Sequence, residues 1–279
     1  MGRKDGKRVK NVEAMYLVAP YIMRERNDAQ NMIHLDIPIE PLNKYIRGKH
    51  DREHVNISHL AIIIAAYLRT CAEFRELNHF VVNKKIYKYN EFTCGMVVLK
   101  PGDNEGTMNK MHLDYNDGIM EVQAKLDEYI QQNRQSGPTN STDKLIKFLL
   151  SVPGLVNFGT SLLIWMDKHN LLPKSIIDAS PFHCTMSITN LASIRTNYIY
   201  HHCYNFGTTS VFIAMGNVRE VPTRSILGVK TVRCIPLGVT MDERIASGSY
   251  FAAAFKRIKA YLADPSLLEG PPQFELFSK

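Results

Sequence analysis

The sequence has 279 residues, of which 45% are hydrophobic and 22% charged, and its formal net charge is +7. This composition is typical of a globular chain that buries a large core. The apolar stretches at 60–68 and 145–166 are too short or too interrupted to cross a bilayer, so we expect no membrane association. No secretory signal opens the chain and its five cysteines form no CxxC pair, which favours reduced thiols in the cytoplasm.

Positive charge gathers at the N-terminus. The first ten residues supply about half of the net charge, through Arg3, Lys4, Lys7, Arg8 and Lys10. No aromatic residue lies among them, so we interpret residues 1–12 as a flexible, solvated basic tail and expect no nucleic-acid binding. Binding of nucleic acid through this tail is the least supported alternative, and a basic pocket for an anionic ligand stays open.

The first half of the chain predicts alternating strands and helices. Residues 31–39 alternate as a strand that should end at Pro38 and Pro41, and Ser58 offers an N-cap for a helix over 59–74. We expect a hairpin over 80–89, with residues 92–99 as its neighbouring strand, and then an amphipathic helix over 117–134.

The second half begins with a strongly apolar segment. Residues 144–170 are apolar nearly all round and broken near Pro153, so we expect two tightly packed helices with Trp165 in their contact. Strands over 183–190, 208–215 and 231–240 and a last helix over 249–262 follow. The pattern predicts a mixed sheet with helices to one side, a single layered α/β (α+β) domain over 13–279.

Four blocks, in this order, carry a resemblance to a known family. They are the helix over 58–74 with the following residues Arg75, Glu76, Leu77 and Asn78, the segment 187–194, the strand 207–216, and the strand and turn 239–248. Together they resemble the chloramphenicol acetyltransferase-like family, which includes the catalytic domain of the 2-oxo acid dehydrogenase acyltransferases (dihydrolipoyl acyltransferases). The resemblance implies a mixed sheet flanked by helices, coenzyme A as acyl donor or acceptor, and a homotrimer with its active sites between chains. It also implies a small-molecule or carrier-bound acyl acceptor. Residues at about 137–180 have no close counterpart in the family's dehydrogenase cores, so we interpret them as a helical insert.

The family's catalytic turn, HxxxDG, is altered to ExxxSG. By resemblance Glu243 takes the place of the general-base histidine and Ser247 that of the aspartate, while Asp242, Arg244 and Gly248 match. The oxyanion-stabilising hydroxyl falls on Thr189, followed by Asn190. The resemblance therefore implies Glu243, Thr189 and Asn190 as catalytic residues.

Glutamate is a weak base for this chemistry. An ordinary glutamate pKa of about 4.3 lies some four units below that of a thiol, unless burial raises it. The alternative is that Glu243 is a surface carboxylate paired with Arg244 or Arg195, which is the arrangement we expect. Thr189 and Asn190 are also ordinary residues for a strand end.

Three histidines are alternative bases: His183, His201 and His202. The run of His201, His202 and Cys203 also invites a metal interpretation. Adjacent residues on a strand point to opposite faces, so these two histidines do not readily share an ion, and we expect no metal site.

Two functions follow from the resemblance. One is an acyltransferase that moves an acyl group between coenzyme A and an acceptor. The other is a catalytically degenerate trimeric scaffold or binding protein of the same fold. Dinucleotide-binding and P-loop enzymes are set aside, because neither GxGxxG nor GxxxxGK[ST] occurs.

Overall fold

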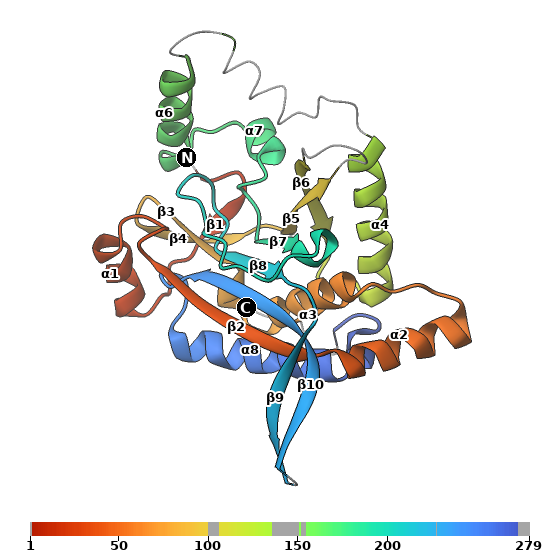
Figure 1. Cartoon of the computed structure of the whole chain (residues 1–279). Helices are drawn as coiled ribbons and strands as arrows, with labels where there is room; N and C mark the ends of the chain where they lie inside the picture. Colours follow the sequence, from red (N-terminus) through yellow and green to blue (C-terminus); the bar gives the residue numbers. More distant parts are fainter. Residues whose placement is uncertain (1, 100–105, 136–150, 152–154, 227, 273–279) are drawn as a thin grey trace.

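A computed structural model describes residues 2–99, 106–135, 151, 155–226 and 228–272. A seven-stranded mixed sheet forms its centre, in the order β2-β10-β8-β7-β5-β6 with β9 paired to β10, and a three-stranded sheet of β1, β4 and β3 lies beside it (Figure 1). The strands are β1 (Gly6–Arg8), β2 (Gln30–Pro38), β3 (His79–Val82), β4 (Lys85–Tyr89), β5 (Phe92–Leu99), β6 (Gly106–Leu113), β7 (Met186–Asn190), β8 (Val211–Met215), β9 (Arg219–Ser225) and β10 (Gly228–Asp242). The helices are α1 (Ala14–Ile22), α2 (Ile39–Glu53), α3 (His59–Glu73), α4 (Ile119–Gln135), α6 (Leu155–Lys168), α7 (Lys174–Ala179) and α8 (Gly248–Ala263).

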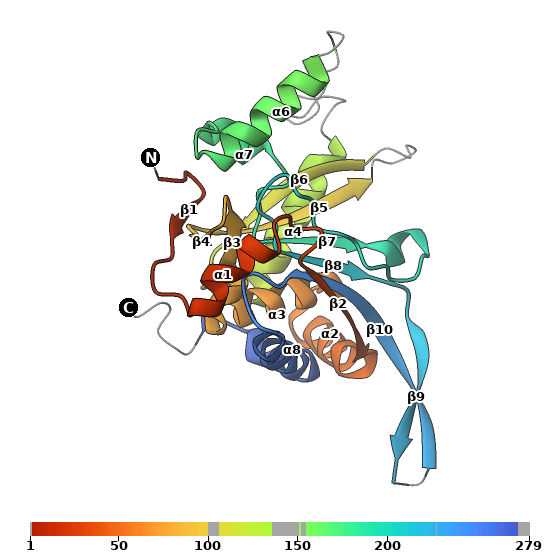
Figure 2. The same cartoon turned by 90° about the vertical axis from the view of Figure 1, so that its left-hand side faces the viewer.

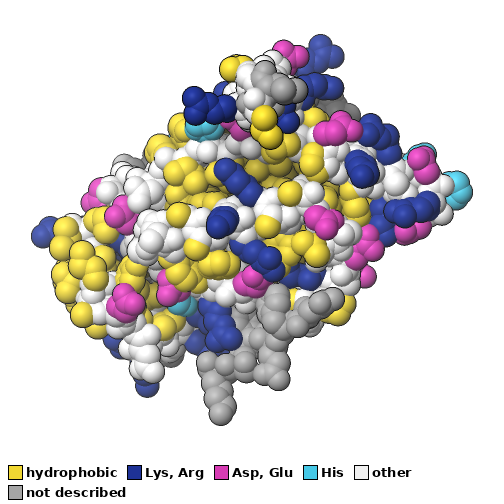
Figure 3. Space-filling model, turned by 90° about the horizontal axis from the view of Figure 1, so that it is seen from below, with side chains coloured by type: hydrophobic (Ala, Val, Ile, Leu, Met, Phe, Trp, Pro, Cys, Tyr) yellow, Lys and Arg dark blue, Asp and Glu magenta, His cyan; other side chains and the backbone are white. Residues whose placement is uncertain are grey.

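Helices α2, α3, α4 and α8 cover one face of the large sheet (Figures 1 and 2). Helix α3 is buried along almost its whole length, and the predicted cap is confirmed, because the Ser58 hydroxyl accepts a hydrogen bond from the Ala61 N–H at 3.1 Å. The outer surface of this helical layer carries apolar and basic side chains side by side (Figure 3). The expected layered α/β architecture is therefore confirmed.

The other face of the sheet carries small and polar residues. Thr189 of β7 lies beside Ala214 of β8, and Ala214 lies beside Gly238 of β10. Their neighbours Ile188 and Ile213 point into the core beneath the helices, so these three residues face the opposite side.

Residues 196–204 cross this second face. A β-carbon at Gly216 or Gly238 would collide with the backbone of Tyr198 and Ile199, so only glycine lets the segment lie this close to the strands. The crossing segment is what brings His201 over the sheet, where its ring stacks on Phe212 with 4.0 Å between centroids.

The N-terminus is not the flexible tail that its charge suggested. Strand β1 pairs with β4, and Arg3 is buried in ion pairs with Asp5 and Asp167. The prediction failed because a lysine- and arginine-rich segment looks solvated in sequence, whereas here one arginine finds two buried carboxylates far along the chain.

Two other expectations were wrong in detail. Strand β5 pairs with β6 and β7, not with the β3–β4 hairpin. The end of the first strand at Pro38 is confirmed, and Pro41 lies in the first turn of α2, where no backbone N–H is needed. Trp165 is 51% exposed and stacks on His169 on the outside of α6, and residues 144–150 lie outside the described part of the chain.

Several elements were not predicted at all. Helix α1 and strands β6 and β9 have no clear apolar periodicity, and β9 with the first half of β10 forms a ribbon that projects from the body (Figure 2). None of the described helices has the length and apolar character needed to cross a bilayer.

Candidate active site

The ExxxSG turn joins the end of β10 to the start of α8. Two backbone hydrogen bonds hold the start of the turn. The Asp242 N–H donates to the Ser210 carbonyl and the Glu243 N–H donates to the Ala29 carbonyl, each at 2.8 Å. The turn is therefore held against the segment before β2 and the segment before β8.

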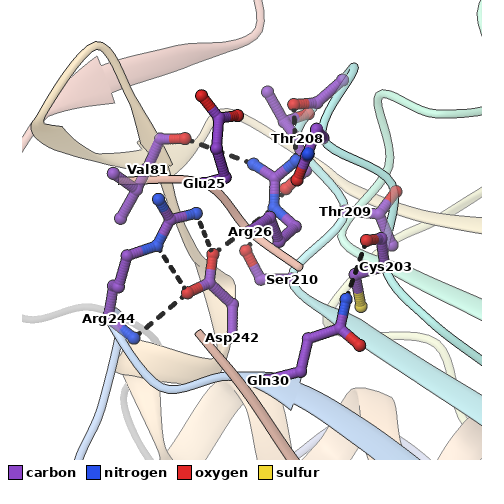
Figure 4. Close-up of polar contacts among 12 residues, drawn as sticks. Glu25, Arg26, Gln30, Val81, Cys203, Thr208, Thr209, Ser210, Asp242 and Arg244 are labelled. Carbon is purple, nitrogen blue, oxygen red and sulfur yellow. Dashed lines mark hydrogen bonds and ion pairs between the residues drawn. The ribbon is translucent and has the colours of Figure 1, made fainter. Parts of the chain in front are cut away.

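Asp242 is the centre of a buried ion cluster (Figure 4). Its carboxylate accepts two hydrogen bonds from the Arg244 guanidinium, at 2.8 and 2.7 Å, and lies 3.4 Å from Nε of Arg26. All three side chains are almost fully buried. The pairing expected between Arg244 and Glu243 is thus wrong, because Arg244 turns back to Asp242 two residues earlier.

Arg26 links this cluster to two further segments. Its guanidinium donates to the carbonyls of Tyr204 and Gly207 at 2.7 and 3.0 Å and to the Val81 carbonyl at 3.2 Å (Figure 4). Arg26 was missed by the sequence analysis, because nothing in its local sequence distinguishes it from a solvated arginine. The cluster is structural: it ties together the turn, the hairpin β3–β4 and the loop before β8.

Ser247, which the sequence resemblance assigned to the aspartate position of the motif, is the N-cap of α8. Its hydroxyl accepts a hydrogen bond from the Tyr250 N–H at 3.2 Å, and the exposed Gly248 begins the helix. A capping role explains a serine at this position without reference to catalysis.

Glu243 is partly buried, and its carboxylate has no hydrogen bond or ion pair within the described residues. It also does not lie near Thr189 of the same chain. Glu243 is five residues beyond Gly238, and Gly238 lies two strands away from Thr189, which places them roughly 20 Å apart at opposite ends of the sheet. The two residues meet only if they come from different copies of the chain.

Thr189 and Asn190 end strand β7. The side-chain carbonyl oxygen of Asn190 accepts a hydrogen bond from the Ser193 N–H at 3.3 Å. Asn190 thereby caps a short 3-10 helix, Leu191–Ile194. The Thr189 hydroxyl has no partner among the residues that the structure describes. Thr189 is therefore free to bind a ligand, while Asn190 holds the turn that follows it.

A hollow of about 510 Å³ opens beside Thr189. Its walls are mainly apolar, from β5, α3, α4 and the crossing segment, and include Val97, Leu99 and Ile199. Its polar lining includes Thr189, Asn190 and His201. Three of the predicted site residues thus share one cavity in a single chain.

His201 lies in this hollow, and its surroundings define the tautomer of its imidazole. Its Nδ1 is 2.9 Å from the His202 carbonyl, an atom that can only accept, so Nδ1 carries the proton. The Nε2 lone pair is then available, and within the described residues it has no partner. Burial lowers the pKa of His201, so the ring is neutral at pH 7.

The other two candidate histidines lie elsewhere. His183 is buried, with Nδ1 2.8 Å from the Ser180 hydroxyl and Nε2 3.4 Å from Asp167, so it belongs to the cluster around Arg3. His202 is exposed and stacks beside His201. Across the described ranges, no three His, Cys, Asp or Glu side chains gather as metal ligands.

Comparison with known proteins agrees with this architecture. No protein-family model matches the sequence, and no curated protein matches it either. Solved structures that are similar include a probable dihydrolipoamide acetyltransferase from Listeria monocytogenes 4b F2365, at 12% identity and a TM-score of 0.59 over 97% of this chain and 98% of that one. The cubic core of the pyruvate dehydrogenase multienzyme complex matches at 12% identity and a TM-score of 0.61 over 94% of each chain. A chloramphenicol acetyltransferase matches at 10% identity and a TM-score of 0.56, over 92% of this chain and 99% of that one.

The chain therefore has the acyltransferase fold that the sequence resemblance implied. In particular, this fold is the one found in the catalytic cores of dihydrolipoamide acetyltransferases and in chloramphenicol acetyltransferase. At this level of identity the likeness extends to the fold, and the site must be argued from its own residues.

Proposed function

We propose that this chain is an acyltransferase that moves an acyl group between coenzyme A and a thiol or hydroxyl acceptor. The observation that carries the proposal is that one hollow is lined by a hydroxyl with no partner among the described residues, on Thr189, and by a neutral imidazole, on His201. A hydrogen-bond donor for an oxyanion and a base for the acceptor are the two groups that acyl transfer needs.

The proposed reaction assigns one role to each residue. Nε2 of His201 removes the proton from the acceptor, whose sulfur or oxygen then attacks the acyl carbonyl. The Thr189 hydroxyl donates a hydrogen bond to the oxyanion that forms. When the intermediate collapses, the carbon–sulfur bond of the thioester breaks, and the coenzyme A thiolate takes the proton from His201. The apolar walls, including Val97 and Leu99, would hold the acyl chain.

The resemblance also supports a homotrimer in the cytoplasm. In such an assembly Glu243 of one copy would approach the Thr189 hollow of another, as the family arrangement implies. Glu243 would then be a second base for the same site.

A second function, binding without turnover, is favoured by the ExxxSG turn. Asp242 and Arg244 form a closed ion cluster and Ser247 caps a helix, so most of the turn has a structural role. A trimeric scaffold of the same fold would need nothing more from these residues.

Turnover with purified protein tests the proposal. Acyl-CoA esters of increasing chain length are incubated with a panel of alcohols, amines and dithiols, and free coenzyme A is measured. The proposal expects release with at least one acceptor, and a loss of about 10²–10³-fold in kcat for Thr189→Val. Thr223→Val, in the projecting ribbon, is the matched control and should keep full activity. Binding of acyl-CoA without release across the whole panel would favour the scaffold.

A further inference from the structure

A second cavity, distinct from the Thr189 hollow, lies on the far side of the ion cluster. Its volume is about 210 Å³, and it lies among the segment between α1 and β2, the turn between β3 and β4, and the C-terminal end of α6. Figure 4 shows the inner wall, where Arg26 and Arg244 lie beside Val81 and Glu25.

The lining of this cleft is strongly cationic. Five basic side chains line it, from Arg24, Arg26, Lys84, Lys168 and Arg244. Among the described residues, two acidic residues also line it, Glu25 and Asp167. Asp242 lies behind the wall and is shared between two of the arginines, so the cleft keeps a positive balance after all three carboxylates are counted.

The two acidic residues do little to neutralise the cations at the outer side of the cleft, Arg24, Lys84 and Lys168. Asp167 is 2.8 Å from Arg3 and 3.4 Å from His183, so it serves partners outside the cleft. Glu25 lies 3.8 Å from Lys168, with both side chains about half exposed, and such a pair is weak. Arg24 has no acidic partner within the described residues.

The turn between β3 and β4 places Lys84 in the lining of the cleft. Asn83 and Lys84 both have positive φ, 46° and 60°, in the two-residue turn between β3 and β4, which is the conformation that such tight hairpins require. The Lys84 ammonium lies 4.6 Å from the centre of the Tyr21 ring. A ring contact carries no negative charge, so the charge of Lys84 is not neutralised by an acidic partner among the described residues.

We propose that this cleft binds a phosphate group. Cations that reach one small volume from four separate segments suit a compact anion with several acceptor oxygens, and arginine and lysine are the usual phosphate ligands. The cleft is closed on the inner side by buried arginines and has no row of aromatic residues, so a nucleic-acid strand does not fit it. This binding does not depend on acyl transfer.

Calorimetry with sodium pyrophosphate at fixed ionic strength tests the site. The variant Arg24→Gln/Lys84→Gln/Lys168→Gln removes the outer cations and leaves the buried ion cluster untouched. The control Lys230→Gln/Lys256→Gln/Lys259→Gln removes the same charge from the ribbon and α8. Binding should weaken at least tenfold in the first variant and change less than twofold in the control. Equal weakening in both would show that only net charge matters and would overturn the proposal.

Coenzyme A and inorganic pyrophosphate separate the two sources of phosphate. If coenzyme A displaces pyrophosphate and also binds at least tenfold more weakly to the cleft variant, its phosphates occupy the cleft. If pyrophosphate binds there and coenzyme A does not displace it, free pyrophosphate is the ligand class. If neither binds more weakly to the cleft variant than to the wild type, the cleft is not a phosphate site. All three readouts are binding measurements, so a protein without acyltransferase activity still decides the question.

Discussion

At the scale of single residues, the surroundings of His201 fix the orientation and the tautomer of its imidazole. Phe212 supports one face of the ring, and the His202 carbonyl fixes the proton on Nδ1. Residue-scale reasoning from the sequence identified His201 only as one of three histidines. It could not rank them, because the ranking depends on which loop crosses the sheet at Gly216 and Gly238.

The pH dependence of turnover follows from the lowered pKa of His201. A base must be neutral to accept a proton, so kcat/KM should be constant at neutral pH and fall only as the pH drops through a value below the ordinary 6.5. Steady-state rates from pH 4.5 to 8 provide the check. A midpoint above 6.5 would show that another group limits the reaction.

Two substitutions separate the hydrogen-bonding role of the Thr189 hydroxyl from the size and shape of the side chain. Thr189→Ser keeps a donor and should retain activity within about tenfold, whereas Thr189→Val should lower kcat about 10²–10³-fold with little change in KM. The split between kcat and KM identifies an interaction made in the transition state. If the serine and valine variants lose the same activity, the hydroxyl is not the oxyanion donor.

At the scale of elements, the sequence predicted the regular parts of the core well. Helix α3 and strand β5 appear with the expected bounds or nearly so, because both are apolar with clear periodicity. Strand β6 and helix α1 were missed, since the edge strand mixes polar residues on both faces and α1 exposes most of its apolar side chains. The ion clusters around Arg3 and Arg26 join residues more than 150 positions apart and have no local signal.

The N-cap of α8 should make a measurable contribution to the free energy of unfolding. Ser247→Ala removes the hydrogen bond to the Tyr250 N–H and should lower the free energy of unfolding by about 1 kcal/mol. Ser249→Ala is the matched control, since Ser249 bonds only to Ser247 in the described structure and should have an effect below about 0.5 kcal/mol. Urea denaturation of the two variants is the measurement. Equal losses would contradict the capping role.

The Arg3 cluster ties the N-terminal segment to α6 through Asp167. Burial alone would raise the pKa of Asp167, but its interactions with His183, 3.4 Å away, and with the charge of Arg3 outweigh the burial and lower that pKa. A carboxylate with a lowered pKa stabilises the folded state above its unfolded pKa, and this contribution is lost as the pH falls through the folded pKa.

Asp167→Asn should therefore destabilise the protein at neutral pH by about 1–3 kcal/mol and flatten the loss of stability below pH 4. Asp178→Asn, which removes an exposed pair with Lys174, serves as the control and should leave that pH profile unchanged. A wild-type profile in the Asp167 variant would show that the carboxylate does not carry this acid sensitivity.

At the scale of the whole molecule, the positions of Glu243 and Thr189 bear on assembly. Their separation within one chain means that any joint role requires a second copy, and light scattering should give the mass of a trimer. Coexpression of Thr189→Val with Glu243→Gln sharpens this test. If the two residues act across chains, mixed trimers regain activity, because some interfaces keep both residues.

Coexpression of Thr189→Val with His201→Asn should not restore activity. Both residues belong to the hollow of one chain, so every chain in a mixed assembly carries a damaged site and no activity returns. A monomer mass in solution, or recovery with this second pair, would contradict the proposed arrangement.

The most direct test of the central claim compares His201→Asn with His202→Asn in a single acyl-transfer assay. The two histidines are adjacent and their rings stack on each other, but only His201 lines the hollow beside Thr189. If His201 is the base, His201→Asn should lower kcat by about 10²–10⁴-fold, while His202→Asn should stay within about twofold of the wild type. Full activity in His201→Asn, or equal losses in both variants, would contradict it.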